Sequence, residues 1–257
     1  MIPPASRAGA EALLLQKLGL HNARGELAEK IAAALPLSAA LPPEALPLER
    51  VRFWVVDVET SGQGPPRDRI IEVAGVEVVG LAAGRSFTTL VNPGLDLPEF
   101  IVRLTGITPV LLETAPKPEA VVPLLDRLFA GSVLCAHHAA FDLKFLDHEF
   151  REVLGKALDL PAVCTVRLAR RVHPELPSHN LDALARRYRL RFGPAGLNRG
   201  RHRALGDAQV TAAIFLALLR KLRRAGVNTL ADLRRFQNLP LRQAHALLAP
   251  FTTAAGR

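Results

Sequence analysis

The sequence has little cysteine, few aromatic residues and no long apolar run. Only Cys135 and Cys164 occur among its 257 residues, and neither has the nearby cysteine that a zinc knuckle or a disulfide scaffold requires. Aromatic residues make up 5% of the chain, which argues against an extended platform for stacking bases. No stretch reaches the roughly 18 apolar residues of a membrane span, and the start MIPPASRAGAEALL lacks the pattern of a secretion signal. We therefore expect a soluble, cytoplasmic protein with no membrane partner.

Positive charge is in excess and is unevenly distributed. The chain has 33 Lys and Arg against 24 Asp and Glu, a net charge of +9. Residues 151–225 alone hold 16 basic and 5 acidic residues, a net charge of +11, whereas residues 1–50 hold five of each and cancel. A basic surface attracts polyanions such as nucleic acids, although it can also serve only solubility.

The sequence pattern divides the chain into three parts. Residues 1–50 read as a helical extension, with helical spacing at Ala10 to Leu20 and Glu26 to Leu35, followed by a Pro-rich linker. Residues 51–224 read as the main domain. Residues 225–257 read as a helical tail with two further helical pieces, Thr229 to Phe236 and Leu241 to Leu248.

Strands come first in the main domain and helices follow. Strands are predicted at Arg52–Val58, Ile70–Val79 and Arg85–Asn92, as an antiparallel meander, and at Ser132–Ala136. Helices are predicted at Pro118–Phe129, Phe141–Leu154, Leu181–Tyr188 and Ala204–Leu222. The segment around Cys164 fits a strand or a helix. This order predicts an α/β fold, a mixed sheet flanked by helices.

Two carboxylates stand at the end of the first predicted strand. Asp57 and Glu59 are two residues apart, so in a strand both side chains project from the same face. Like charges held this close repel each other, and hard divalent cations with oxygen ligands would relieve the repulsion. The pair alone also fits a strand that ends in a polar loop.

Three more residues are candidates for metal binding or proton transfer. Asp142 opens a helix directly after a buried strand, where an Asp is also an ordinary choice for the first turn. His202 lies in a loop rich in Gly and Arg, and Asp207 follows at the start of a long helix. Imidazole changes charge near neutral pH, which suits a general base. By contrast, His173 and His179 have no carboxylate at metal-ligand spacing and are expected at the surface.

Taken together, these segments resemble one family. The chain resembles the DEDDh 3'-5' exonucleases, particularly the proofreading epsilon-type subunits of bacterial DNA polymerase III. The family motifs Asp-x-Glu-Thr-Thr-Gly, His-Asn-Ala-x-Phe-Asp and His-Arg-Ala-x-x-Asp-Ala correspond to Asp57–Gly62, His137–Asp142 and His202–Ala208. The strand beginning at Ile70 and the segment Thr105–Thr108 also match. Together they span roughly residues 52–222, in the family's order.

The resemblance implies a ribonuclease H-like fold and a two-metal site. Asp57, Glu59, Asp142 and Asp207 would hold two Mg²⁺ ions, for which Mn²⁺ would substitute, and His202 would be the general base. Further residues beside the motifs would contact the substrate: Thr60, His137, His138, Phe141, Arg199, Arg201 and Arg203. The implied function is release of 5'-mononucleotides from single-stranded or frayed 3' ends of DNA, in proofreading or repair, with a polymerase subunit as a possible partner.

Two departures from the family pattern and two alternatives accompany this interpretation. His138 replaces the usual Asn, and Cys164 replaces a common Asp, although neither belongs to the catalytic set. An exoribonuclease would use the same active site, since nothing in the motifs reads the 2'-hydroxyl. A non-catalytic adaptor of a polymerase or repair complex would keep the fold without needing the five site residues.

Overall fold

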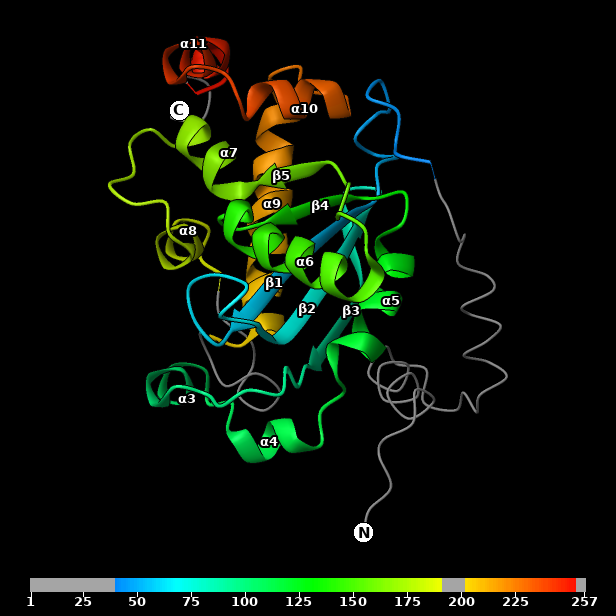
Figure 1. Cartoon of the computed structure of the whole chain (residues 1–257). Coiled ribbons are helices and arrows are strands. Elements are labelled where there is room, and N and C mark those ends of the chain that lie inside the picture. The colour runs from blue at the N-terminus through cyan, green and yellow to red at the C-terminus, as the bar shows by residue number, and fades with distance from the viewer. Residues whose placement is uncertain (1–39, 191–201, 253–257) are drawn as a thin grey trace.

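The computed structural model describes residues 40–190 and 202–252 (Figure 1). Within these residues five strands form one mixed sheet in the order β3-β2-β1-β4-β5. The strands are β1 (Phe53–Thr60), β2 (Ile70–Val79), β3 (Ala82–Leu90), β4 (Val133–Ala136) and β5 (Ala162–Cys164). The described helices are α3 (Glu99–Thr105), α4 (Pro109–Glu113), α5 (Pro118–Phe129), α6 (Ala139–Leu154), α7 (Thr165–Val172), α8 (Leu181–Arg187), α9 (Ala204–Arg224), α10 (Leu230–Phe236) and α11 (Leu241–Thr252).

The sheet combines the two kinds of strand pairing. β1, β2 and β3 form the predicted antiparallel meander, whereas β4 pairs with β1, and β5 with β4, in parallel. Parallel pairing follows from the connections, because α5 lies between β3 and β4 and α6 lies between β4 and β5. The predicted mixed sheet flanked by helices is confirmed.

Helices cover both faces of the sheet (Figure 1). Phe53 and Val55 of β1 pack in the same core as α9, and Trp54 and Val56 pack in the core that contains α5 and α6. Successive side chains of a strand alternate between faces. Continuing this alternation directs the carboxylates of Asp57 and Glu59 to the α9 face, where the apolar residues of β1 end.

The C-terminal helices belong to the main core. Leu230, Leu233 and Phe236 of α10 lie in the cluster that contains the buried residues of β1 and α9. The side-chain amide of Gln237 pairs with strand β5, donating to the carbonyl oxygen of Ala162 (3.0 Å) and accepting from the backbone N–H of Cys164 (3.0 Å). Residues 225–252 are therefore attached to the sheet by apolar packing and by backbone-directed hydrogen bonds.

Several local predictions need correction or lie outside the described residues. Helices α3 and α4 were not predicted, because each is short and carries exposed apolar residues that obscure helical spacing. The ambiguous segment around Cys164 is both elements in turn, strand β5 followed by helix α7. The N-terminal helices predicted before residue 40 lie outside the described residues. Among the described helices, none combines the length and apolarity needed to cross a membrane.

Candidate active site

The end of β1 supplies the first two carboxylates. Asp57 and Glu59 lie in the last four residues of β1, after an apolar run, and Glu59 is only 9% exposed. Directly opposite Glu59 in the antiparallel register stands a third carboxylate, Glu72 of β2. Concentrated negative charge therefore lies on the α9 face of the sheet.

Helix α6 brings Asp142 to the same strand. The residue is 3% exposed, and its Oδ1 accepts a hydrogen bond from the backbone N–H of Val58 at 3.2 Å, between the two carboxylates of β1. Burial raises the pKa of Asp142 to about 8, because the ionised form loses its hydration. A cation beside Asp142 would favour the ionised form and offset this loss.

Helix α9 and the turn before it bring Asp207 and His202. One ligand atom from each of Glu59, His202 and Asp207 lies within 4.8 Å of the others. The backbone of His202 adopts a left-handed conformation (φ 65°), and its N–H donates to Oδ2 of Asp207 at 3.3 Å. The turn thus folds the imidazole back towards the start of α9.

These five residues come from three distant segments and meet where β1 ends. The fit to a divalent cation is chemical as well as geometric, since buried carboxylate oxygens are the ligands that Mg²⁺ and Mn²⁺ prefer. The arrangement can hold such ions and can place an imidazole beside them. The structure brings Glu59, His202 and Asp207 within 4.8 Å of one another and Asp142 to the backbone of Val58, whereas metal binding by these residues stays a prediction.

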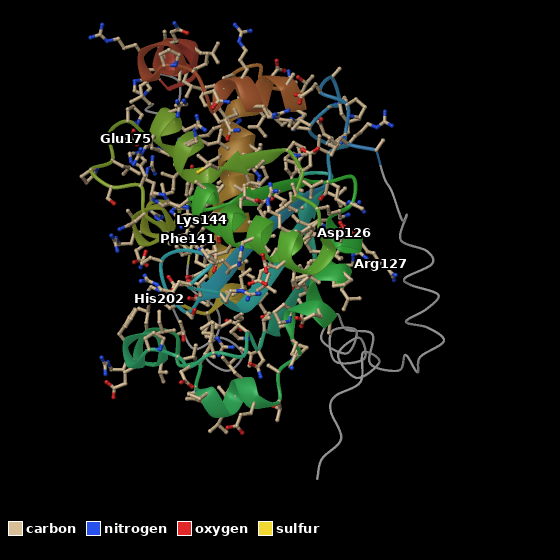
Figure 2. The ribbon with its side chains drawn as sticks, viewed as in Figure 1. Asp126, Arg127, Phe141, Lys144, Glu175 and His202 are labelled. Carbon is tan, nitrogen blue, oxygen red and sulfur yellow. The ribbon has the colours of Figure 1, made fainter. Side chains whose placement is uncertain are left out.

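Four of the expected substrate contacts lie beside this cluster. Thr60 is buried, and its hydroxyl donates to the carbonyl oxygen of Gly62 at 2.7 Å. Phe141 is half-buried on α6 and packs against Phe145, with ring centroids 5.1 Å apart. Figure 2 shows Phe141 projecting from α6 on the side of the molecule where His202 lies. His137 directly follows β4, and its Nδ1 is 2.8 Å from the hydroxyl of Thr165.

The departure at His138 has a conformational explanation. His138 precedes α6 with a left-handed backbone (φ 68°, ψ 44°) and an exposed side chain. Asn, Asp and His are the non-glycine residues enriched in this conformation. A His in place of the family's Asn therefore preserves the turn that delivers Asp142.

Of the three arginines predicted to contact phosphates, the structure describes only Arg203. Arg199 and Arg201 lie outside the described residues. Arg203 is partly buried, and its guanidinium forms a bidentate ion pair with Glu72, at 2.7 and 3.0 Å. That pair explains how Glu72 is tolerated opposite Glu59.

Sequence reasoning missed Lys144, Arg69 and Glu149. Lys144 Nζ donates to the carbonyl oxygen of Gln63 at 2.7 Å and lies 5.1 Å from the ring centroid of Phe141. Arg69 forms a bidentate ion pair with the buried Glu149 of α6, at 2.8 and 2.6 Å. Both contacts join the loop after Glu59 to helix α6. Their partners are about 80 residues away in sequence, which no local pattern reveals.

The loop after β1 requires a glycine at residue 62. A Cβ atom there would lie 2.4 Å from Cγ of Asp68, whose Oδ2 accepts from the backbone N–H groups of Gln63 and Gly64 at 2.8 and 2.9 Å. We expect Gly62→Ala to lower the free energy of unfolding by about 1–3 kcal/mol and to reduce turnover. In the matched control Gly64→Ala, the new Cβ would make an ordinary 3.6 Å contact with Lys144. Equal melting temperatures for the two variants would contradict this prediction.

Fold and site together define a nuclease of the ribonuclease H-like class. The chain belongs to the exonuclease family, since the family model described as Exonuclease matches residues 54–215. This match contains Asp57, Glu59, Asp142 and Asp207, together with His202.

Similarity to known exonucleases and polymerase subunits supports this family assignment. The chain is 39% identical over 186 residues to the DNA polymerase III subunit epsilon-like protein of Rhodobacter capsulatus, covering 71% of this chain and 26% of that protein. It is 35% identical over 170 residues to the DNA polymerase III subunit epsilon of Aquifex aeolicus, covering 66% and 81%. Exonuclease X in complex with 5' overhanging duplex DNA has a similar structure, with a TM-score of 0.54, 28% identity, and coverage of 66% and 91%. Several curated relatives are much longer, and the chain spans 31%, 26% and 20% of three of them.

Proposed function

We propose that this protein is a metal-dependent 3'-5' exonuclease that releases 5'-mononucleotides from DNA. The observation that carries the proposal is the convergence of Glu59, His202 and Asp207 within 4.8 Å, beside a buried Asp142 at the end of β1. Such a cluster costs stability unless it serves a cation. The family shown by the sequence match uses this fold for hydrolysis of nucleic-acid ends.

Four carboxylates would hold the metal. In the proposed assignment the carboxylates of Asp57, Glu59, Asp142 and Asp207 would hold two Mg²⁺ ions. Bound divalent ions would supply charge neutralisation at the phosphate and lower the energy of the attacking hydroxide. Mn²⁺ is expected to replace Mg²⁺ because both prefer oxygen ligands.

His202 would accept the proton of the attacking water. A turn residue near the start of a long helix is accessible to a substrate and yet is held by its neighbours, as the hydrogen bond from its backbone to Asp207 illustrates. Thr60 follows Glu59 in β1, and His137, His138 and Phe141 directly precede Asp142; all four are proposed to contact the terminal nucleotides. The exposed Lys144, beside Phe141, joins this set as a candidate phosphate contact.

DNA is proposed as the substrate, and a polymerase as a possible partner. Both follow from the names of the similar proteins, two of which are epsilon or epsilon-like subunits of DNA polymerase III, and from the DNA in the exonuclease X complex. A stand-alone repair nuclease would use the same site. An exoribonuclease and a non-catalytic adaptor are separated from this proposal by experiment.

The test is digestion of single-stranded DNA labelled at its 3' or 5' end, beside an RNA of the same sequence, with Mg²⁺, Mn²⁺ or EDTA. Wild type is expected to release labelled mononucleotides from the 3'-labelled DNA at once and to shorten the 5'-labelled strand stepwise. Asp57→Ala should remove this activity. Asp159→Ala, at an exposed position, is the matched control. Circular dichroism checks that both variants fold.

Each alternative gives a distinct result. Faster digestion of RNA than of DNA would replace the proposed substrate. Loss of label from the 5' end first would reverse the proposed direction. No digestion of either strand with either metal, by a folded wild type, would leave the adaptor as the better explanation.

A further inference from the structure

The carboxylate of Glu72 is buried next to the proposed metal ligands but is not one of them. Its residue is 2% exposed, and it stands opposite Glu59 on the neighbouring strand. Directly opposed residues of an antiparallel pair have side chains on the same face, so two carboxylates share this part of the sheet. A like-charge pair in this position is destabilising unless one member is neutralised.

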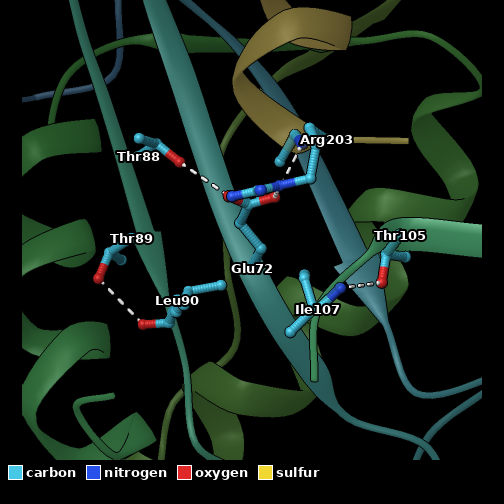
Figure 3. Close-up of polar contacts among 8 residues, drawn as sticks. Glu72, Thr88, Thr89, Leu90, Thr105, Ile107 and Arg203 are labelled. Carbon is cyan, nitrogen blue, oxygen red and sulfur yellow. Dashed lines mark hydrogen bonds and ion pairs between the residues drawn. The ribbon is translucent and has the colours of Figure 1, made fainter. Parts of the chain in front are cut away.

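Glu72 is neutralised by the segment that joins His202 to Asp207. Its Oε1 accepts from Nη2 of Arg203 at 2.7 Å, and its Oε2 accepts from Nε of Arg203 at 3.0 Å (Figure 3). Oε2 also accepts from the backbone N–H of Ala204 at 3.0 Å. Both oxygens are thus engaged by residues that immediately follow His202.

Glu72 also provides a hydrogen-bond acceptor at the start of α9. The N-cap residue of α9, Arg203, makes no side-chain cap hydrogen bond. The first N–H groups of a helix need acceptors, and a carboxylate near the helix start is further favoured by the helix dipole. Glu72 supplies that acceptor from β2, 132 residues away from Ala204 in sequence. The helix that carries Asp207 is therefore fixed to the strand beside Glu59.

We propose that Glu72 and Arg203 form a positioning pair, which holds His202 and Asp207 in place against Glu59 and does not itself bind metal or phosphate. This role rests on the proposed function, because it concerns the alignment of that same site. The pair connects the β-sheet half of the site to its helical half. It also reassigns Arg203, whose sequence context suggests a phosphate contact.

Geometry favours positioning over the two competing roles. A bidentate pair uses two of the guanidinium's directed donors, which are then unavailable to a phosphate, and both partners are largely buried (side chains 27% and 3% exposed). The hydroxyl of Thr88 also donates to Oε1 of Glu72 at 3.4 Å, so a metal ion at Glu72 would compete with four hydrogen bonds. The positive charge of Arg203 additionally acts on Glu59, and the pKa of Arg203 is raised chiefly by its hydrogen bonds to Glu72.

The same strand offers a matched control. Glu77 of β2 forms an equivalent bidentate pair with Arg85, at 2.9 and 2.9 Å, and is 7% exposed. It stands opposite Trp54, at the other end of β1 from the carboxylates. Glu77→Gln therefore removes the same kind of ion pair from the same strand without touching the site.

The experiment compares Glu72→Gln, Arg203→Met, the double variant and Glu77→Gln. We expect Glu72→Gln to lower kcat by about 10- to 100-fold with little change in KM, as for other groups that orient metal ligands. The double variant should be no slower than the slower single variant, because the two residues act as one unit. Hydrogen exchange of the peptide containing residues 202–207, followed by mass spectrometry without metal or DNA, should speed up in Glu72→Gln and not in Glu77→Gln.

The outcomes separate this proposal from the proposed function. Equal kcat and equal exchange in Glu72→Gln and wild type would overturn the positioning role while the function stands. A raised KM in Arg203→Met that adds to the effect of Glu72→Gln would return Arg203 to the phosphate and also overturn it. If wild type fails to digest DNA, the function fails, and the exchange of residues 202–207 still decides whether Glu72 holds this segment.

Discussion

Asp142→Asn is expected to abolish most turnover and, in the absence of metal, to stabilise the protein. The amide has the shape of the carboxyl group and keeps an oxygen for the N–H of Val58, so the fold should be retained. It has no negative charge for a cation, and we expect kcat to fall by roughly 100-fold or more, since mutation of even a residue that only orients a metal ligand typically costs about 10- to 100-fold. Asp159→Asn, at an exposed position, should have neither effect.

The stability effect follows from the pKa of Asp142, which burial raises to about 8 from 3.8. Between these values the folded state keeps a proton that the unfolded state has released. The raised pKa of Asp142 therefore stabilises the metal-free wild type in full below pH 3.8. This stabilisation is lost as pH rises towards 8, by up to about 1.4 kcal/mol per pH unit. Asn does not titrate, so the free energy of unfolding of the variant should lack this part of the pH dependence.

Thermal unfolding in EDTA from pH 5 to pH 8 measures the difference in stability between Asp142→Asn and wild type. The melting temperature of the Asn variant should exceed that of wild type by a margin that grows with pH. Added Mg²⁺ should reduce the margin, because it binds the ionised wild-type site more tightly. A wild type that is as stable as the variant at pH 8 in EDTA would show that Asp142 is not under electrostatic strain.

His202→Ala is expected to lower kcat by roughly 10²- to 10⁴-fold, the range for loss of a general base. KM for DNA should change little if the imidazole acts only on the attacking water. Added imidazole should restore part of the activity by occupying the vacated space. The matched control is His148→Ala, a half-buried histidine on α6.

Metal affinity distinguishes a base from a ligand at this position. His202 lies within ligand distance of Glu59 and Asp207, so the geometry alone also permits it to bind the ion. Calorimetric titration of the DNA-free protein with Mn²⁺ should give the same affinity for His202→Ala and wild type. A marked loss of affinity would make His202 a metal ligand and would assign the proton transfer to another group.

The strands and the main helices could be predicted from the sequence because their apolar patterns are local. The run from Ile70 to Val79 is apolar apart from Glu72 and Glu77, which is typical of a strand covered on both sides, and β2 has these bounds. The amphipathic segments likewise predicted α5, α6 and α9 to within a few residues. By contrast, α3 and α4 are short, with Phe100 and Val110 exposed, so they lack a continuous apolar face.

The residues of the candidate site could be named from spacing and resemblance, but their partners could not. Sequence reasoning placed Arg203 at a phosphate because nothing local indicates that Glu72 lies beside it. It also placed His173 at the surface, which is wrong. His173 is 1% exposed, and its ring nitrogens contact Glu175 and Tyr188 at 2.9 and 2.7 Å. Neither the pairing of Arg203 nor the burial of His173 has a local signal, since a polar residue's exposure depends on partners that only the tertiary fold supplies.

The hydrogen bonds of Gln237 have a consequence for self-association. Strand β5 lies at the edge of the sheet, and the unpaired backbone groups of an edge strand are a template for pairing with another chain. The Gln237 amide occupies the carbonyl of Ala162 and the N–H of Cys164, which are the groups that an incoming strand would use. One side chain from the C-terminal helices therefore blocks this edge, and truncation before residue 237 would expose a site for edge-to-edge aggregation even where the nuclease fold survives.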